Sequence, residues 1–538
     1  MSDVSDWLAT AERFIDDGDP RGARACAHEI LELDEKSADG WALLAECELY
    51  LGSLDAAEEH ARTAIEIDRE HLRAQLVIGG VASERFALDI ELPTLKAVAD
   101  RARQLHDHKI LFKAITWLSN GLYLAGEPSA AADCLLEAST LNPNRAPELY
   151  SKHLFYRNYR QTPSRDVAAR FQSFFNHIDT INRTTVEHNK IRVGYISPDF
   201  RNHAVANFVV PFLKHFDAEH FQVYCYQTTK GDAVTARLKR NKVVWRNLID
   251  KTPLESARSI ANDHIDILID LSGHTQNSCL PILAYKPAPV QITAIGYVGS
   301  TGLNAVDFFL SDKLSSPPST DFTEQLLLMP DCHLCYSPIK NMPDVPAVEH
   351  QHITFGSFNN FAKISDHVLE LWKAILDRVR HARLIIKSKT CSIPSGRAIV
   401  EQRLNHVGID INRVELRPFS PDYLQQYADI DIALDAFPYN GGLTTCEALY
   451  MGVPVIALCG HTHADRIAAS ILNSARLNEL IASTEDEYIN KAVALANAPD
   501  RINHYRTTLR PSIEQSPLMD ARLYICNFEA VIKNIGVK

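Results

Sequence analysis

A glycine pair followed by two threonines and a glutamate is the segment whose residue types best suit ligand chemistry. Residues 437–454 read FPYNGGLTTCEALYMGVP and follow an apolar run, 430–434, that is typical of a buried parallel strand. Glycine lets a backbone approach a ligand, and the first turn of a helix presents free N–H groups at its positive end. We therefore predict a phosphate or diphosphate site that comprises Gly442, Leu443, Thr444 and Thr445, with Glu447 placed to accept hydrogen bonds from ribose hydroxyls. An ordinary strand–helix loop capped by a threonine has the same local pattern.

Three more polar side chains follow predicted strands. Lys363 comes after an apolar run at 353–358, where a lysine can offset charge on a leaving diphosphate, although a solvated lysine after a turn has the same pattern. His203 follows the run 191–197 and titrates near neutrality, so it could take a proton from a hydroxyl; a lone histidine is more often a surface residue. His274 follows the run 265–271, and we expect it to face the same cleft.

The N-terminal part of the chain is repetitive. Trp7 and Trp41 lie 34 residues apart, and the same offset relates Gly18 to Gly52 and Ala23 to Ala57. A third clear unit carries Gly126 and Ala131, and residues 72–111 form a degenerate unit with a short insertion. This period resembles the tetratricopeptide repeat, a helix pair stacked into a solenoid whose groove takes extended peptides. A purely structural cap on the following domain is the alternative.

From residue 190 the pattern changes to alternating strands and helices. Two such runs, separated by a Pro-rich and polar stretch, indicate two Rossmann-like halves with parallel sheets and a ligand cleft between them. The predicted strands are 191–197, 221–227, 265–271, 290–297, 307–311, 353–358, 384–387, 414–416, 430–434 and 455–458. We assign the solenoid to 1–145, connecting helices to 146–189, the first half to 190–345, and the second half with the C-terminal helices to 346–538.

Composition excludes several classes of protein. The 538 residues are 46% hydrophobic and 23% charged, as expected for a globular chain of about three domains. The net charge of −12 argues against sequence-independent binding of nucleic acid. No apolar run reaches membrane-spanning length, and residues 1–6 lack a basic-then-apolar signal. Eleven scattered cysteines are typical of reduced thiols, so we expect a cytoplasmic protein.

Two patterns have the spacing of metal ligands. Cys332 and Cys335 enclose a histidine, but no second such pair accompanies them, and we interpret them as core residues rather than zinc ligands. Asp429 and Asp431 form a DxD that begins a buried strand, where edge groups are more common than metal ligands. We therefore expect no metal site and no cofactor.

Residues 191–500 resemble the nucleotide-sugar protein O-glycosyltransferases of the O-GlcNAc transferase/Spindly family. The matching stretches are residues 192–200 with His203, 286–291, 356–360 with Lys363, and 435–454. Tetratricopeptide repeats that precede such a domain are the family's arrangement. The resemblance implies a GT-B fold, an α/β architecture of two Rossmann-like domains, here preceded by an all-α solenoid.

The resemblance also implies an activity: inverting, metal-independent transfer of GlcNAc from UDP-GlcNAc to Ser or Thr hydroxyls of proteins. Lys363 matches the family's diphosphate-contacting lysine, His203 matches a histidine near the acceptor hydroxyl, and Asp263 aligns loosely with another suggested base. Tyr423 and Gln425 stand where O-GlcNAc transferases place a histidine and an arginine beside the uracil.

These departures leave the donor open. Residues 442–445 read GLTT where O-GlcNAc transferases carry His-Thr-Thr, and 444–454 is closer to the Spindly branch, some of whose members transfer fucose from GDP-fucose. A peptide-binding adaptor with a degenerate transferase half is one alternative, and a transferase for small molecules or glycans is another. We expect a nucleotide-sugar donor, peptide acceptors bound in the repeat groove, no nucleic acid or membrane partner, and a possible homo-oligomer.

Overall fold

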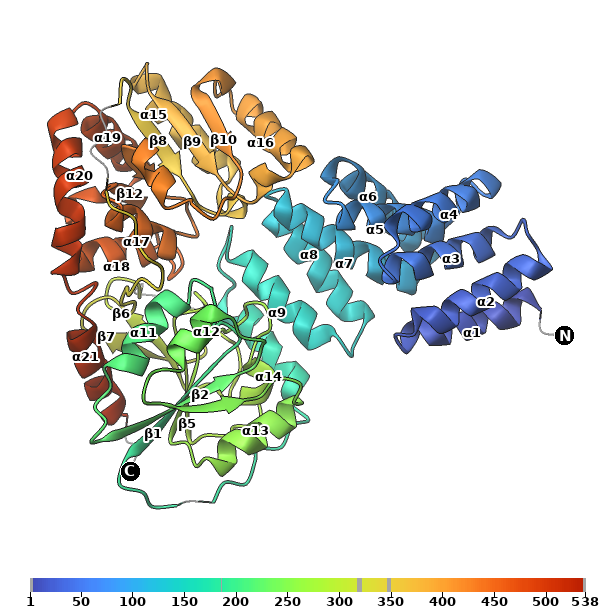
Figure 1. Cartoon of the computed structure of the whole chain (residues 1–538), viewed down its shortest axis with the longest axis horizontal. Coiled ribbons are helices and arrows are strands. Elements are labelled where there is room, and N and C mark those ends of the chain that lie inside the picture. Colours follow the sequence, from blue (N-terminus) through green and yellow to red (C-terminus); the bar gives the residue numbers. More distant parts are fainter. Residues whose placement is uncertain (1–2, 185, 317–321, 346–349, 536–538) are drawn as a thin grey trace. The chain divides into compact units, whose positions relative to one another are not determined.

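The structure, a computed structural model, describes residues 3–184, 186–316, 322–345 and 350–535. The chain divides into two compact units, one formed by Met1–Leu149 with Thr390–Val400 and the other by Tyr150–Lys389 with Glu401–Lys538 (Figure 1). Among the described helices, none is both long and apolar enough to cross a membrane.

The first unit is built from eight consecutive helices, each packed on the next, which confirms the predicted all-α solenoid. They are α1 (Val4–Asp16), α2 (Pro20–Leu33), α3 (Ala38–Tyr50), α4 (Leu54–Ile67), α5 (Leu72–Glu84), α6 (Leu88–Leu105), α7 (His108–Leu124) and α8 (Pro128–Leu141).

The repeat residues explain these helix pairs. Ala23, Ala57 and Ala131 are fully buried, so each second helix can approach its neighbours closely. Each first helix of a clear unit ends in a glycine with positive φ, which permits the tight turn into the second helix. In the degenerate unit, Phe86 adopts this left-handed conformation with φ 55° instead of a glycine. The insertion in that unit lengthens α6 to 18 residues.

Short helices follow the solenoid. They are α9 (Ala146–Arg157), α10 (Arg165–Ala169) and the 3-10 helix η1 (Arg170–Phe175). The hydroxyl of Tyr150 on α9 donates to the carbonyl of Val167 on α10 at 2.7 Å, and this bond ties the two helices together.

A seven-stranded parallel sheet forms the first α/β half, in the order β3-β2-β1-β4-β5-β6-β7. Its strands are β1 (Ile191–Ser197), β2 (Phe221–Gln227), β3 (Val244–Asn247), β4 (Ile267–Asp270), β5 (Val290–Thr293), β6 (Phe308–Asp312) and β7 (Gln325–Met329). The helices that follow them are α11 (Ala206–Lys214), α12 (Ala233–Leu238), α13 (Pro253–Asn262) and α14 (Leu280–Leu283). Strands β3 and β7 were not predicted.

The last helix corrects one assignment. The prediction placed all C-terminal helices with the second half, but α21 (Ala521–Lys533) packs on the first sheet. Its Tyr524, Ile525 and Phe528 belong to the same buried cluster as Val193 of β1 and Val223 of β2. The rings of Tyr524 and Phe528 both meet Phe212 of α11 edge to face.

A six-stranded parallel sheet forms the second half, in the order β10-β9-β8-β11-β12-β13. Its strands are β8 (Thr354–Ser357), β9 (Arg383–Lys387), β10 (Val414–Arg417), β11 (Ile432–Leu434), β12 (Val455–Leu458) and β13 (Ile481–Ala482). Its helices are α15 (Asp366–Arg378), α16 (Pro394–His406), α17 (Leu443–Tyr450), α18 (Ile467–Ser474), α19 (Glu485–Ala496) and α20 (Pro499–Glu514), with 3-10 helices η2 (Phe361–Lys363), η4 (Ile411–Arg413), η5 (Gln425–Asp429) and η6 (Asn478–Leu480). The 3-10 helix η3 (Thr390–Ser392) and the first part of α16 fall in the segment Thr390–Val400, which is grouped with the first unit.

The strand order fixes where each half can bind a ligand. In the first sheet the direction of progression reverses between β1 and β4, and in the second between β8 and β11. Ligands of open parallel sheets bind outside the carboxyl ends of the strands at such a switch point. The loops after β8 and β11, which carry Lys363 and residues 435–447, therefore lie where this rule expects a site.

Candidate functional site

The last part of the segment between β11 and α17, residues 439–442, forms a tight connection that we call the glycine turn. Gly442 is the N-cap of α17 and supplies no side-chain cap, so the first-turn N–H groups remain available for an anion. A Cβ atom on Gly442 would meet nothing within 4 Å, whereas one on Gly441 would lie 2.6 Å from the hydroxyls of Thr444 and Thr445. One glycine therefore closes the turn and the other leaves open space beside the helix start.

The two threonines have different surroundings. Thr444 is half-buried and its hydroxyl donates to the side-chain carbonyl of Asn359, in the loop after β8, at 2.9 Å. Thr445 is 2% exposed and its hydroxyl donates to the carbonyl of Gly441 at 3.0 Å. The hydroxyl of Thr445 thus holds the turn together. Only the backbone N–H of Thr445 is placed for the predicted phosphate site. Leu443 is half-buried as the first residue of α17.

Lys363 lies at the end of η2 beside the glycine turn. Its ammonium donates to the carbonyl of Asn440 at 2.6 Å and sits 4.0 Å from the centre of the Tyr439 ring. Burial lowers the pKa of Lys363 to about 8, and the nearby carboxylate of Asp435 opposes that shift. The lysine thus carries a positive charge at neutral pH next to the uncapped start of α17.

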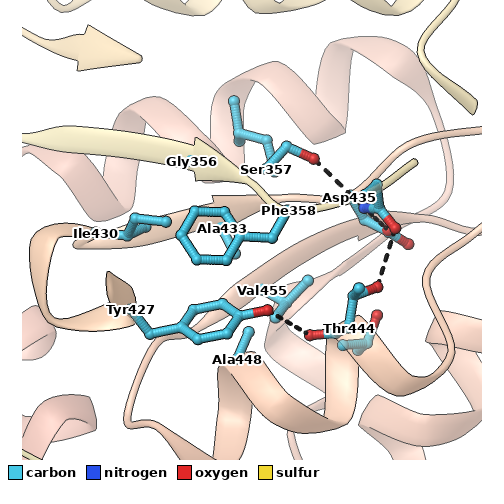
Figure 2. Close-up of a pocket in the computed structure, with 13 residues that line it drawn as sticks. Gly356, Ser357, Phe358, Tyr427, Ile430, Ala433, Asp435, Thr444, Ala448 and Val455 are labelled. Atoms are coloured by element: carbon cyan, nitrogen blue, oxygen red, sulfur yellow. Dashed lines mark hydrogen bonds between the residues drawn. The ribbon is translucent and has the colours of Figure 1, made fainter. Parts of the chain in front are cut away.

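The space beneath the turn is nearly filled. Figure 2 shows the side chains that line an internal cavity between β8, β11 and α17, among them Phe358, Tyr427 and Val455. Its volume is about 10 Å³, which is room for one water molecule at most. The nucleotide predicted at this turn would therefore have to approach from its outer side, where Gly442 leaves open space.

Glu447, one turn into α17, is joined to two residues from other segments. It is 3% exposed and accepts a hydrogen bond from the Tyr423 hydroxyl at 2.5 Å. Lys340 in turn donates to the Tyr423 oxygen at 3.0 Å and lies 4.5 Å from the centre of its ring. Burial raises the pKa of Glu447 to about 7, against the effects of Tyr423 and Lys340. Gln425, two residues after Tyr423, is exposed at the start of η5.

In the first half, His203 follows β1 and is paired with a buried carboxylate. Its Nδ1 atom lies 3.5 Å from Oδ2 of Asp199, and its side chain is 41% exposed. Burial lowers the pKa of His203 while Asp199 opposes that shift, which favours the neutral imidazole, the form that can accept a proton. The structure therefore leaves His203 able to act as a base.

Asp263 does not lie where the prediction placed it. It caps the C-terminal end of α13 and precedes β4, so it lies at the amino edge of the first sheet, away from the carboxyl ends of the strands. Its carboxylate accepts three hydrogen bonds from Arg246, at 2.8, 3.0 and 3.3 Å, and a fourth from the Tyr226 hydroxyl at 2.9 Å. This ion pair is structural, and Asp263 is removed from the candidates for the base.

His274 also has a different environment from the one predicted. It is 1% exposed, and its ring contacts Phe171 and Tyr297 edge to face. Nδ1 lies 2.8 Å from the Ser151 hydroxyl and Nε2 lies 2.8 Å from the Thr301 carbonyl. Both ring nitrogens are thus in use inside the protein, and neither remains for a ligand.

The buried His274 gives a prediction about stability. Burial lowers its pKa to about 3, below the ordinary value of 6.5 that holds in the unfolded chain. The unfolded state therefore gains a proton as pH falls below about 6.5, and the stability contributed by the neutral ring is lost in that range. We expect His274→Asn to lower the thermal midpoint more at about pH 7.5 than at about pH 5.5. Equal losses at both pH values would contradict a neutral, buried His274.

The potential metal ligands are already paired within the protein. Asp312, Cys332 and His333 are buried with their ligand atoms within 4.8 Å of one another. However, Asp312 accepts from His333 Nδ1 at 2.6 Å and also from Ser315 and Ser470. In the DxD segment, Asp429 pairs with Arg417 at 2.5 Å and Asp431 with His350 at 2.8 Å. Internal hydrogen bonds and ion pairs account for both groups.

Several residues of the site were not predicted. Asp435 directly follows β11, and Asn359 lies two residues after the end of β8. Their position at the carboxyl edge of the sheet could have identified them as site residues. Asp199 follows β1 in the same way. Lys340 lies in the segment between β7 and β8, and nothing in its local sequence marks it as a neighbour of Tyr423.

Known proteins share this architecture. The structure of a mutant O-GlcNAc transferase from Thermobaculum terrenum superposes with a TM-score of 0.73 at 26% identity, covering 99% of this chain and 97% of that one. With a helical-repeat unit followed along the chain by two parallel Rossmann-like sheets, the fold is that of a GT-B glycosyltransferase with an N-terminal solenoid.

Sequence relatives give the family. Residues 138–345 and 343–528 match glycosyl transferase family 41, and the chain belongs to that family. The probable UDP-N-acetylglucosamine–peptide N-acetylglucosaminyltransferase SPINDLY of Petunia hybrida is 36% identical over 421 residues, 76% of this chain and 44% of that protein. The protein of the same description named SEC, from Arabidopsis thaliana, is 26% identical over 360 residues, 63% of this chain and 36% of that protein. The chain spans less than half the length of these curated relatives.

Proposed function

We propose that this chain is an inverting, metal-independent protein O-glycosyltransferase that moves GlcNAc from UDP-GlcNAc to Ser or Thr hydroxyls. The observation that carries the proposal is the uncapped start of α17, with open space at Gly442 and the ammonium of Lys363 beside it. Membership of glycosyl transferase family 41 supports the reaction class.

The site residues divide the work as follows. The donor diphosphate binds at the first turn of α17, where backbone N–H groups and Lys363 offset the negative charge that grows as it leaves. A fixed cation supplies that stabilisation, so the proposal requires no divalent metal. Glu447 accepts from the ribose hydroxyls, and His203 takes the proton of the acceptor hydroxyl as the new glycosidic bond forms with inversion.

The acceptor is proposed to be a protein segment. The relatives SPINDLY and SEC are named as transferring to peptide, and the helical-repeat unit of this chain is the type of scaffold that binds extended peptides.

GDP-fucose is the second candidate donor. Tyr423, which is hydrogen-bonded to Glu447 and Lys340, stands at the position beside the donor nucleobase where O-GlcNAc transferases are expected to carry a histidine. Identity is higher to SPINDLY than to SEC, 36% against 26%, but both relatives are named for UDP-N-acetylglucosamine, so the identities do not favour GDP-fucose.

One experiment separates these possibilities. The full chain is incubated in parallel with UDP-GlcNAc and GDP-fucose in EDTA, with a co-expressed protein mixture as acceptor, and released nucleotide and acceptor mass are followed. The proposal predicts UDP release with a GlcNAc mass shift on protein. GDP release with a fucose shift would instead establish the second donor. Modification of small molecules alone, or no release of either nucleotide, would overturn the proposal and favour a glycan transferase or a binding adaptor.

The role of Glu447 makes a pH-dependent prediction. Because burial raises its pKa to about 7, the carboxylate that accepts from the ribose is lost as pH falls below that value. Lys363, whose pKa is about 8, titrates in the same range in both proteins, so the effect of Glu447 is read from the comparison of the two. Between about pH 8 and about pH 6, the ratio of donor affinities of the wild type to Glu447→Gln, measured by calorimetric titration, should decrease several-fold. An unchanged pH profile in Glu447→Gln would exclude the carboxylate from donor binding.

A further inference from the structure

A buried carboxylate lies directly under the glycine turn. Asp435 follows β11 and is 2% exposed. Its Oδ1 atom accepts from the backbone N–H of Gly441 at 2.9 Å and from the side-chain amide of Asn359 at 3.2 Å. Its Oδ2 atom is buried and has no hydrogen-bond partner among the described residues. An unpartnered buried oxygen is costly, so the charge it carries calls for a compensating group.

Oδ1 connects the two loops that form the site. Asn359, which donates to Asp435, accepts from the hydroxyl of Thr444 at the first turn of α17. A single carboxylate oxygen thus links the loop after β8, the glycine turn and the start of α17. Figure 2 shows Asp435 between Ser357 and Thr444. The side chain of Asn359 joins all three: its amide N–H donates to Ser357 at 3.4 Å and to Asp435, and its carbonyl accepts from Thr444.

Lys363 lies on the other side of the same peptide group: its ammonium donates to the carbonyl of Asn440 at 2.6 Å, and Asp435 accepts from the Gly441 N–H of that peptide. We propose that Asp435 is a positioning residue whose Oδ1 atom holds the glycine turn to the loop after β8, while its negative charge keeps Lys363 in the ammonium form. The role of that ammonium in balancing a diphosphate rests on the proposed function. The coupling between the two side chains does not.

The direction of the pKa shifts agrees with this geometry. Burial lowers the pKa of Lys363 to about 8, and Asp435 is the charged side chain that opposes this decrease. Burial raises the pKa of Asp435 to about 6, and Gly441 and Lys363 limit that rise. At neutral pH the pair is therefore a carboxylate and an ammonium.

Other charged groups around Lys363 are occupied elsewhere. Arg160 donates to the carbonyl of Ala362 at 2.6 Å, and Arg403 donates to the carbonyl of Ile364 at 3.1 Å and to Asp366 at 2.7 Å. The Tyr439 ring contributes its face to the ammonium. These groups stay in place when Asp435 is changed, so a change in Lys363 titration reports on Asp435.

The test compares Asp435→Asn with the wild type. Asparagine keeps an acceptor for Gly441 and Asn359 and removes the charge. The rate at which acetic anhydride modifies Lys363 is followed by mass spectrometry against pH, with the half-buried Lys373 as internal reference. We expect the midpoint for Lys363 to fall by about one pH unit in Asp435→Asn, and to stay in place in Asp435→Glu. Asp431→Asn, at the other end of the same strand segment, is the matched control and should leave it unchanged. An unchanged midpoint in Asp435→Asn would overturn the inference.

Should Asp435→Asn not fold, the reciprocal variant gives the answer. In Lys363→Gln the carboxyl of Asp435, followed by NMR of labelled aspartate, should titrate about one pH unit higher than in the wild type because its counter-charge is gone. No difference would again overturn the inference. Nucleotide release by the wild type is measured alongside. A shift in Lys363 without any release would count against the proposed function alone, and release with no shift would count against this inference alone.

Discussion

Lys363→Ala is expected to lower the rate of sugar transfer by roughly 100-fold or more while the fold is retained. Removal of one preorganised group that stabilises developing charge typically costs about 3 kcal/mol of transition-state stabilisation. The ammonium donates to the carbonyl of Asn440, and that carbonyl belongs to a turn also held by Asp435 and Thr445. The measurement is turnover with saturating donor, together with the thermal midpoint of each variant.

Lys373→Ala is the matched control for this variant. Lys373 lies ten residues on, is 36% exposed and pairs with Asp377 one turn along α15. Its loss should leave turnover unchanged. Full activity in Lys363→Ala would remove the lysine from the reaction, and equal losses in both variants would show that charge near α15, rather than the site, is responsible.

Alanine at the two glycines of the turn should have different effects on the stability of the protein. In Gly441→Ala the new Cβ would lie 2.6 Å from two threonine hydroxyls and 2.9 Å from Oδ1 of Asp435. Threonine side chains have little rotamer freedom, so the turn must move, and we expect a loss of stability of about 1–3 kcal/mol together with loss of donor binding. Gly442→Ala has no such contacts and should unfold at the wild-type temperature.

Donor binding is the second measurement on this pair. The donor is proposed to approach the open side of Gly442. Gly442→Ala should therefore bind nucleotide at least tenfold more weakly without any loss of stability. Wild-type affinity in Gly442→Ala would mean that the ligand does not approach there. Wild-type stability in Gly441→Ala would contradict the packing of the turn.

Most strands were predictable because both faces of a parallel sheet are buried. Strands β1 and β2 contain the largely apolar runs VGYI and VYCY for that reason. The edge strand β3, with the sequence VWRN and two exposed residues, has no such run and was missed. Strand β7 was hidden in a polar, Pro-rich stretch, and the docking of α21 on the first sheet depends on contacts that no local pattern encodes.

The site was predictable where strand direction decides. Residues that follow a parallel strand lie at its carboxyl edge, which correctly brings together Lys363 and the segment 442–447. Asp263 precedes β4, so the same rule would have excluded it. His274 follows a strand but is covered by α9 and η1, through Ser151 and Phe171, and such coverage is visible only in three dimensions.

Calorimetric titration of the full chain with UDP and with GDP, in EDTA, tests whether the glycine turn binds a nucleoside diphosphate. We expect one of the two nucleotides to bind with one site per chain. Lys363→Ala and Gly442→Ala should each weaken this binding, while Lys373→Ala should not. If neither nucleotide binds, or if binding is the same in all variants, the glycine turn of the second half does not hold a nucleoside diphosphate and the account is wrong.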